Sequence, residues 1–437
     1  MTTPRRIQFG VFFQGVNFGT IWSSDRSGSQ YDFESFRRIA QTAERGLFSA
    51  FFLGEGLRLR EHFGRIHDLD IAGRPDAQTQ LAALAAVTER IGLVATQNTT
   101  YNDPYDLAKR LNSLDLLSDG RAGWNIVTTD NAWTGANFRR GGYLEHADRY
   151  RRAAQFVAAA QRLWDAGADG VGTPVRVGDQ LVSFEGPAPL PPSAQGRPVL
   201  FQAGDSDEGR EFAAASADVI FSGHPGLEDA VAFAADVRRR LPRHGRSEDD
   251  LKFFPGAQFI LAATDAEARE KAEWVTRAQV SPQTAIRFLE PIWGRDLSEF
   301  DADGPLPDID PVVDEVDGQR GSLFQGRRAV ETAREWRESA AAEGLSIREF
   351  VIKRSSLRTF VGGYSTIADR VQQYVDAGAV DGFNVSPYLV PEGLDDIVDG
   401  LIPELQERGI YPTGYVGTTL RENLGLPEVG ERAELAA

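Results

Sequence analysis

Polar side chains stand at the ends of apolar, strand-like runs, which is where α/β enzymes usually keep the groups that bind ligands. Thr96 and Asn98 end the run IGLVATQNT, and Asn125 lies inside the run AGWNIV. An amide inside an apolar strand is unfavourable unless it is fully hydrogen-bonded or faces a polar site. The two runs therefore predict a ligand-facing cluster whose chemistry is hydrogen bonding and positioning.

His146 and Tyr150 form a second candidate pair. They are four residues apart in a helical stretch, so both project from the same face. Together they could hold one ligand, although a packed, hydrogen-bonded His–Tyr pair is the simpler interpretation. The pair begins the helix after the polar loop that follows AGWNIV, and binding residues are frequent in such places.

The segment PVLFQAGDSDEGREFAA indicates a strand, a glycine turn and the start of a helix. Ser206 is placed as the N-cap, directly after Gly204 and Asp205. The unpaired N–H groups and the positive dipole end of such a helix could bind a phosphate, although a simple N-cap is the alternative. A phosphate there requires the Asp205 carboxylate to point away from it. No GxGxxG or Walker motif indicates a dinucleotide or a triphosphate.

Catalysis by the protein's own nucleophile or metal is poorly supported. The chain has no cysteine and no GxSxG motif, and its five histidines include no HxH or HExxH pair. A weak metal site between His62 and His67 is the only arrangement to weigh, and solvated loop histidines explain it better. We therefore expect no metal, and a bound cofactor that supplies the reactivity.

Eight strand-like runs separated mostly by helices position these residues. They span 7–13, 49–53, 91–99, 122–127, 198–203, 218–221, 256–262 and 382–386. This alternation predicts an α/β fold with parallel strands, most economically a closed (β/α)8 TIM barrel, with an open doubly wound sheet as the alternative. In a barrel the residues after each strand converge on one mouth, and they include Glu55, Thr96, Asn98, Ser206, Ser222 and Pro387.

One domain, 1–437, is expected, because a barrel with insertions reaches this length. About 100 residues separate the seventh strand from the helix at Thr366, which exceeds an ordinary connection between a strand and a helix. We expect an insertion at 281–350, the largest in the chain. It could be a lid over the mouth, a surface excursion or a subunit contact.

The composition limits the partners. The net charge of −17 and the pI near 4.9 disfavour nucleic acid and anionic membrane surfaces. No apolar run approaches the roughly 18 residues of a membrane span, and the short apolar start carries no cleavage-site pattern. The expected location is the cytoplasm.

Several stretches together resemble one family. They are AERGLFSAFFLGEGL, LAALAAVTERIGLVATQNTTYNDPYDLAKR, LDLLSDGRAGWNIVTT, EHADRYRRAAQF, GRPVLFQAGDSDEGREFAA, GAVDGFNVSPYLVP and GYVGTTLRENLGL. On these residues the chain resembles the bacterial-luciferase-like flavin monooxygenases, in the group of nitrilotriacetate monooxygenase, dibenzothiophene sulfone monooxygenase and the large chain of pristinamycin synthase. The combination of GRAGWNIVTT with the downstream H-x-x-x-Y is the most specific part.

The resemblance implies a TIM barrel that binds reduced FMN supplied by a separate NAD(P)H:flavin reductase. Such an enzyme reacts the flavin with O2 and oxygenates a small organic substrate through a flavin–oxygen adduct, and its relatives form homodimers or homotetramers. Two alternatives stay open on the same fold. One is a deazaflavin-dependent oxidoreductase, and the other is a flavin-binding protein without turnover.

The resemblance also implies roles for individual residues. The family's flavin-contacting acidic position falls on Glu55, where most relatives have Asp, and its phosphate-binding serine falls on Ser206. The expected catalytic residues are Thr96, Asn125 and His146. The expected cofactor contacts are Glu55, Thr96, Asn98, Asn125, His146, Tyr150, Gly204, Asp205 and Ser206. The expected substrate contacts are Phe12, Trp22, Trp133 and Arg139, the last of which stands where relatives have glycine.

Overall fold

The computed structural model describes residues 6–13, 19–29, 31–57, 61–62, 65–66, 74–129, 132–135, 137–138, 146–224, 226–312, 326–356 and 359–430. Side chains at 61–62, 65–66, 132–133, 146–147 and 326–328 lie outside this description.

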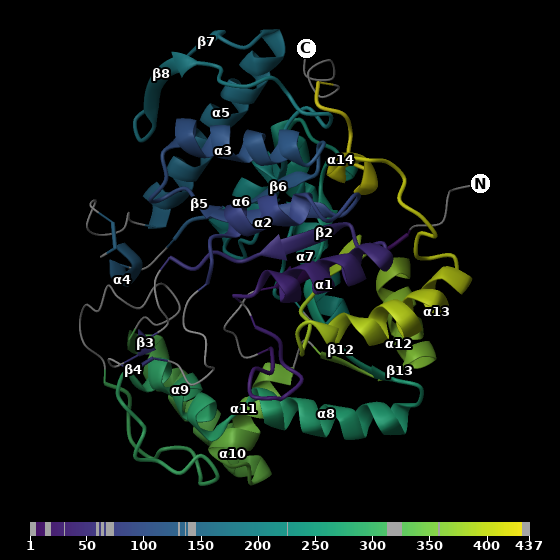
Figure 1. Ribbon diagram of the computed structural model, residues 1–437. Helices are drawn as coiled ribbons and strands as arrows, with labels where there is room; N and C mark the ends of the chain where they lie inside the picture. The colour runs from purple at the N-terminus through teal and green to yellow at the C-terminus, as the bar shows by residue number, and fades with distance from the viewer. Residues whose placement is uncertain are drawn as a thin grey trace.

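A parallel sheet forms the centre of the protein (Figure 1). Its strands are β1 (Gln8–Phe13), β2 (Ala50–Leu53), β5 (Gly92–Asn98), β6 (Ala122–Val127), β9 (Val199–Gln202), β10 (Val219–Ile220), β11 (Lys252–Phe253), β12 (Gly256–Ala262) and β14 (Gly382–Val385). They pair in chain order, and the last strand, β14, pairs with the first. Each of the eight predicted strand runs contains one of these strands.

The seventh strand closes the sheet into a barrel. On one side, the N–H groups of Phe254 and Gly256 donate to the carbonyls of Ile220 and Ser222 at 2.9 and 3.2 Å. On the other side, the Asn384 N–H donates to the Pro255 carbonyl at 2.9 Å. The same stretch is thus bonded on both edges, which confirms the barrel and rules out the open sheet. Pro255 has no N–H to donate, which accounts for the break between β11 and β12.

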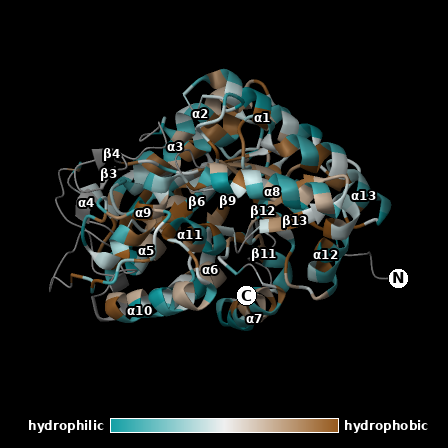
Figure 2. Cartoon of the chain, turned by 90° about the horizontal axis from the view of Figure 1, so that it is seen from below, coloured by the Kyte–Doolittle hydropathy of each residue, from teal (hydrophilic) through white to brown (hydrophobic). Residues whose placement is uncertain are grey.

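Helices surround the barrel. The long ones are α1 (Phe33–Arg45), α2 (Ala77–Ala85), α3 (Pro104–Leu117), α5 (His146–Asp169), α6 (Asp207–Ser216), α7 (Leu227–Arg240), α8 (Asp265–Gln279) and α12 (Tyr364–Asp376). Shorter ones are α4 (Ala132–Gly135), α13 (Ile402–Glu407), α14 (Leu420–Asn423), three 3-10 turns (Leu241–His244, Glu248–Asp250 and Glu392–Leu394) and a π-helical turn (Ile397–Leu401). Figure 2 shows hydrophilic and hydrophobic bands alternating along the outer helices, as expected of helices that pack one face against a sheet.

The helix α2 ends at Ala85, before the segment that leads into β5. The carboxylate of Glu44 accepts the backbone N–H groups of Glu89, Arg90 and Ile91 at 2.8, 2.5 and 2.9 Å. These N–H groups therefore bond to a side chain on α1, and the helix ends before them.

Among the described residues, β11 and three further strand elements were not predicted. Two are hairpins, β3–β4 (Glu61–His62 and Arg65–Ile66) after β2, and β7–β8 (Pro174–Gly178 and Ser183–Pro187) after α5. The third is β13 (Thr359–Gly363), which pairs in parallel with β12 outside the barrel.

The two faces of each barrel strand build different cores. On β1, Phe13 contacts Phe36 of α1 at 5.0 Å between ring centroids, whereas Phe12 contacts Phe52 of β2 at 5.0 Å. Phe52 also meets Phe201 of β9 at 6.4 Å, although β5 and β6 separate their strands in the sheet. Such a contact is made across the barrel interior. Burying each ring contributes about 1.5–3 kcal/mol, so this inner cluster is a substantial part of the core.

The amino-terminal end of the barrel is closed by α14. Leu420 and Leu424 belong to the same buried cluster as Phe52 and Phe201. Gly92 leaves room for this plug, because a Cβ atom at that position would lie 2.4 Å from Leu420 Cδ1. The opposite, carboxyl-terminal end is therefore the side on which a ligand can enter.

The described residues within the expected insertion at 281–350 include three helices. These are α9 (Pro282–Trp293), α10 (Gly326–Glu343) and the start of α11 (Ile347–Ser355). Trp336 packs against Phe288, Trp293 and Phe350 at 5.8, 6.3 and 5.5 Å, in a cluster separate from the barrel core. Among all described residues, no helix combines the length and apolarity needed to cross a membrane.

Candidate active site

Thr96 and Asn125 meet inside the barrel near its carboxyl-terminal end. They are register partners on β5 and β6, and Asn125 Nδ2 donates to Thr96 Oγ1 at 3.1 Å. Both side chains are buried, with exposed fractions of 6% and 4%. Asn125 Oδ1 has no hydrogen-bond partner among the described residues. A buried amide oxygen in that state costs about 1–3 kcal/mol unless a ligand supplies a donor.

Asn98 and Glu55 form a second polar pair, from the ends of β5 and β2. Asn98 Nδ2 donates to both carboxyl oxygens at 3.2 Å, and Asn98 Oδ1 accepts the Tyr101 N–H at 2.6 Å. Burial raises the pKa of Glu55 to about 7, although the hydrogen bonds from Asn98 act to lower it. The carboxyl group can therefore be neutral or ionised near neutral pH, and can donate or accept accordingly.

The start of α6 forms a close-packed cradle. Ser206 caps the helix, and its Oγ accepts the Gly209 N–H at 3.1 Å. A Cβ on Gly204 would lie 2.7 Å from Gly209 Cα, and a Cβ on Gly209 would lie 3.0 Å from the Tyr150 hydroxyl. Glycine is thus needed at both positions. The residues predicted for a phosphate site, Tyr150 of α5 and 204–206 after β9, are brought together here.

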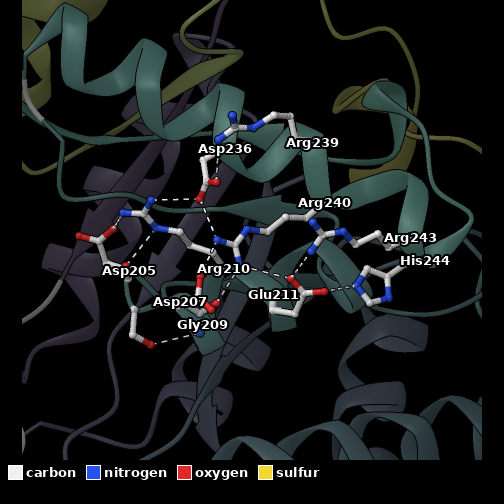
Figure 3. A network of polar contacts seen from close by, with 11 residues as sticks. Asp205, Asp207, Gly209, Arg210, Glu211, Asp236, Arg239, Arg240, Arg243 and His244 are labelled. Carbon is white, nitrogen blue, oxygen red and sulfur yellow. Dashed lines mark hydrogen bonds and ion pairs between the residues drawn. The ribbon is translucent and has the colours of Figure 1, made fainter.

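The Asp205 carboxylate is engaged by two basic side chains. Its Oδ1 accepts Arg210 Nη2 at 3.0 Å and lies 2.9 Å from His224 Nε2. Burial raises the pKa of Asp205, but the contacts with His224 and Arg210 outweigh it and leave the pKa below its ordinary value. Figure 3 shows the guanidinium of Arg210 between the carboxylates of Asp205 and Asp236.

The four expected substrate residues have different positions. Phe12 is half-buried on the inner face of β1, within the phenylalanine cluster. Trp22 is buried with Phe13 in the outer layer between barrel and helices, at 6.3 Å between rings. Arg139 and the side chains of Trp133 and His146 lie outside the described residues, so nothing about their placement enters the site.

Most of the apolar residues lining the barrel interior near Thr96 and Asn125 were not predicted. Phe52, Phe201 and Phe221 join Phe12 there, with Phe52 and Phe221 at 4.8 Å and Phe201 and Phe221 at 5.7 Å. The alternation of faces along each strand was the available signal, because it assigns Phe12 to one face and Phe13 to the other. The contacts of Arg210 and His224 with Asp205 had no comparable signal.

Comparison with known proteins identifies the family. A family model described as luciferase-like monooxygenase matches residues 7–381. One chain of pristinamycin IIA synthase from Streptomyces pristinaespiralis is 41% identical, with 98% of each chain covered. Nitrilotriacetate monooxygenase component A of Aminobacter aminovorans is 38% identical, also with 98% of each chain covered. A solved riboflavin lyase, with modified FMN and the substrate riboflavin, has 27% identity and a TM-score of 0.78, covering 99% of this chain and 100% of that one.

These findings confirm the resemblance and the expected reaction class, a flavin-dependent monooxygenase, over the deazaflavin and non-catalytic alternatives. The chain belongs to the luciferase-like monooxygenase family.

Proposed function

We propose that this chain is the oxygenase component of a two-component system. It binds reduced FMN supplied by a separate NAD(P)H:flavin reductase and uses O2 to oxygenate a small organic substrate. The observation that carries the proposal is the buried Asn125 Oδ1, which has no partner in the described part of the chain and faces the barrel interior beside Thr96. Reduced FMN, when bound, supplies the electrons that place one atom of O2 in the substrate and the other in water.

The cradle at α6 fits the phosphate of FMN. Gly204 and Gly209 let the turn after β9 pack closely on the helix start, and Ser206 and the Tyr150 hydroxyl lie beside it. The first N–H groups of α6 have no partner within the helix, and its dipole favours an anion. We assign the phosphate to these residues, with the Asp205 carboxylate held aside by Arg210 and His224.

Thr96 and Asn125 are proposed to act at the flavin ring and on oxygen. Thr96 Oγ1 already accepts the Asn125 amide, so its own proton is available to donate to a bound group. Asn125 Oδ1 can accept from an N–H of the ring. Two fixed dipoles in a buried site stabilise developing charge without reorganising, which is the main contribution a protein makes in such chemistry. His146 keeps its predicted catalytic role, and its side chain is not described.

The remaining groups are proposed to hold the ring and to exclude water. Glu55 and Asn98 lie at the rim, where their hydrogen-bonded pair can meet the flavin, and Phe12 offers an apolar surface to flavin or substrate. In Figures 1 and 2, α9 lies beside the β3–β4 hairpin that follows β2. This supports the insertion as a cover over the mouth. We also propose a homodimer or homotetramer in the cytoplasm.

An anaerobic titration with reduced FMN tests the proposal. The chain should bind reduced FMN, and with O2, a flavin reductase and the correct member of a substrate panel it should incorporate one labelled oxygen atom from 18O2. A reduced deazaflavin serves as the control and should give no oxygenated product. Failure to bind reduced FMN would contradict the proposal.

A further inference from the structure

A carboxylate lies directly beside the proposed phosphate site, which is an unfavourable place for it. Asp205 immediately precedes Ser206, the N-cap of α6, and its side chain is about half exposed, at 55%. A unit negative charge a few ångströms from a phosphate dianion weakens the binding of that dianion. The site must therefore let the phosphate bind in spite of this carboxylate.

Two basic side chains hold the Asp205 carboxylate. Arg210 Nη2 donates to Oδ1 at 3.0 Å, and Arg210 Nε donates to the backbone carbonyl of the same residue at 3.1 Å. His224, from the loop after β10, lies 2.9 Å from the same Oδ1. Both basic groups contact the ring of Phe233, whose centroid lies 4.8 Å from the Arg210 guanidinium carbon and 4.8 Å from the His224 ring centroid.

The positive charge around Asp205 is not in excess. Arg210 also donates to Asp236 at 3.1 Å, so its single charge is shared between two carboxylates. Arg240 is shared among three, Asp207, Glu211 and Asp236 (Figure 3). Arg239 and Arg243 contact Asp236 and Glu211, so four arginines face four carboxylates in this network, and Asp205 keeps part of its effect on an anion bound at α6.

We propose that Asp205 lowers the affinity of the chain for a phosphorylated flavin, and that Arg210 and His224 are positioning residues that hold its carboxylate away from the phosphate. The inference rests on the proposed function. Its consequence is a flavin that exchanges readily, as an oxygenase needs when it receives reduced flavin from another protein and must release the oxidised form.

The test compares reduced FMN with reduced riboflavin, which has the same ring system and no phosphate. Binding of each to the full chain is measured anaerobically by quenching of tryptophan fluorescence. Asp205→Asn should tighten reduced FMN by about tenfold and leave riboflavin unchanged, as expected for removing one charge near a dianion. The gain should shrink at high salt, because the site is partly exposed. Glu211→Gln, in the same network but a turn further along α6, is the matched control and should change neither affinity.

The positioning role needs a second set of variants. His224→Gln and Arg210→Gln should each weaken FMN, by about threefold and about tenfold, with riboflavin again unchanged. Adding Asp205→Asn to either variant should restore FMN binding at least to the parent value, because no carboxylate is left to hold. Should Arg210 contact the phosphate itself, Asp205→Asn would not rescue its loss.

Three outcomes overturn the inference. They are an unchanged FMN-to-riboflavin ratio in Asp205→Asn, a weaker FMN affinity in that variant, and no rescue in either double variant. If the parent chain binds neither reduced FMN nor reduced riboflavin, the proposed function fails and the inference fails with it. If the parent chain binds both flavins but Asp205→Asn leaves the FMN-to-riboflavin affinity ratio unchanged, the inference fails and the proposed function stands.

Discussion

One buried polar side chain at each end of the barrel, Arg121 and Asn125, shows a difference between the two ends. At the closed amino-terminal end, the guanidinium of Arg121 makes five hydrogen bonds of 2.8–3.0 Å, to Ser118, Ile91 and Ala85 carbonyls and to the hydroxyl and carbonyl of Thr88. At the open end, Asn125 Oδ1 is buried with no partner in the described structure. Arg121 thus contributes to the stability of the closed end, where Gln8 Oε1, Arg421 Nε and Asn423 Nδ2 also have no partner among the described residues, whereas Asn125 keeps hydrogen-bonding capacity for a ligand at the open end.

An unpaired oxygen alone does not identify a site. Asn112 of α3 is also buried, donates to the Pro191 carbonyl at 3.0 Å, and likewise has an Oδ1 without a partner in the described ranges. It lies in the helix layer, whereas Asn125 faces the barrel interior beside Thr96. A binding site is therefore identified by the position of the unpaired atom as well as by its missing partner.

Arg121→Ala should destabilise the closed end of the barrel. Removing the guanidinium leaves several buried carbonyls unpaired, and each costs about 1–3 kcal/mol, so we expect the free energy of unfolding to fall by roughly 4 kcal/mol. Urea unfolding followed by circular dichroism measures the change. Arg37→Ala, at an exposed pair with Glu34, is the control and should leave the free energy of unfolding nearly unchanged. Equal losses in both variants would refute the structural role of Arg121.

The run GRAGWNIVTT shows how much the sequence could predict. As one stretch it indicated a strand with a ligand-facing amide, and the strand bounds 122–127 agree with β6. The structure divides the run between the two ends, with Arg121 in the closed end and Asn125 in the open one. Sequence spacing predicts which face a strand residue takes. The five acceptor atoms of Arg121 belong to four residues in α2, in the segment after it and at the end of α3, and no sequence pattern indicates that these residues meet.

The candidate site was predictable to different degrees. Residues at strand ends, such as Thr96, Asn98 and Glu55, follow from the strand pattern, because parallel strands bring their carboxyl ends together. The partners of Asp205 were less predictable: Asp205 and His224 follow the paired strands β9 and β10, but nothing in the sequence indicates that their side chains meet. Trp22 was expected to contact substrate; it is buried with Phe13, and its contact with substrate stays a prediction.

Asn125→Leu should reduce oxygenation at the open end without destabilising the fold. Leucine removes the unpaired oxygen and the bond to Thr96 together, so we expect the free energy of unfolding to change by no more than about 1 kcal/mol. Oxygenation with reduced FMN should fall by about 100-fold, the size of losing one fixed dipole at a reacting centre. Both quantities are measured on one preparation.

Asn112→Leu is the matched control for that variant. It removes an amide of the same kind from α3, so it should lower stability through the lost bond to Pro191 and leave oxygenation unchanged. Comparable losses of oxygenation in both variants would remove the distinction between the helix layer and the barrel mouth.

Glu55→Gln should change the stability of the chain in a way that depends on pH. Burial raises the pKa of Glu55 from 4.5 to about 7 in the folded chain, so folding disfavours ionisation. This destabilising effect is absent below pH 4.5, grows between pH 4.5 and about 7, and is complete above that range. Glutamine avoids it and still accepts from Asn98, so we expect a gain of about 1 kcal/mol at pH 8, after allowance for partial exposure, and much less at pH 5. Glu34→Gln, where Arg37 lowers the pKa of an exposed carboxyl, should give no gain at pH 8. An equal gain from Glu55→Gln at both pH values would mean that the carboxyl is not held near neutrality, and the open end would then lack its titrating group.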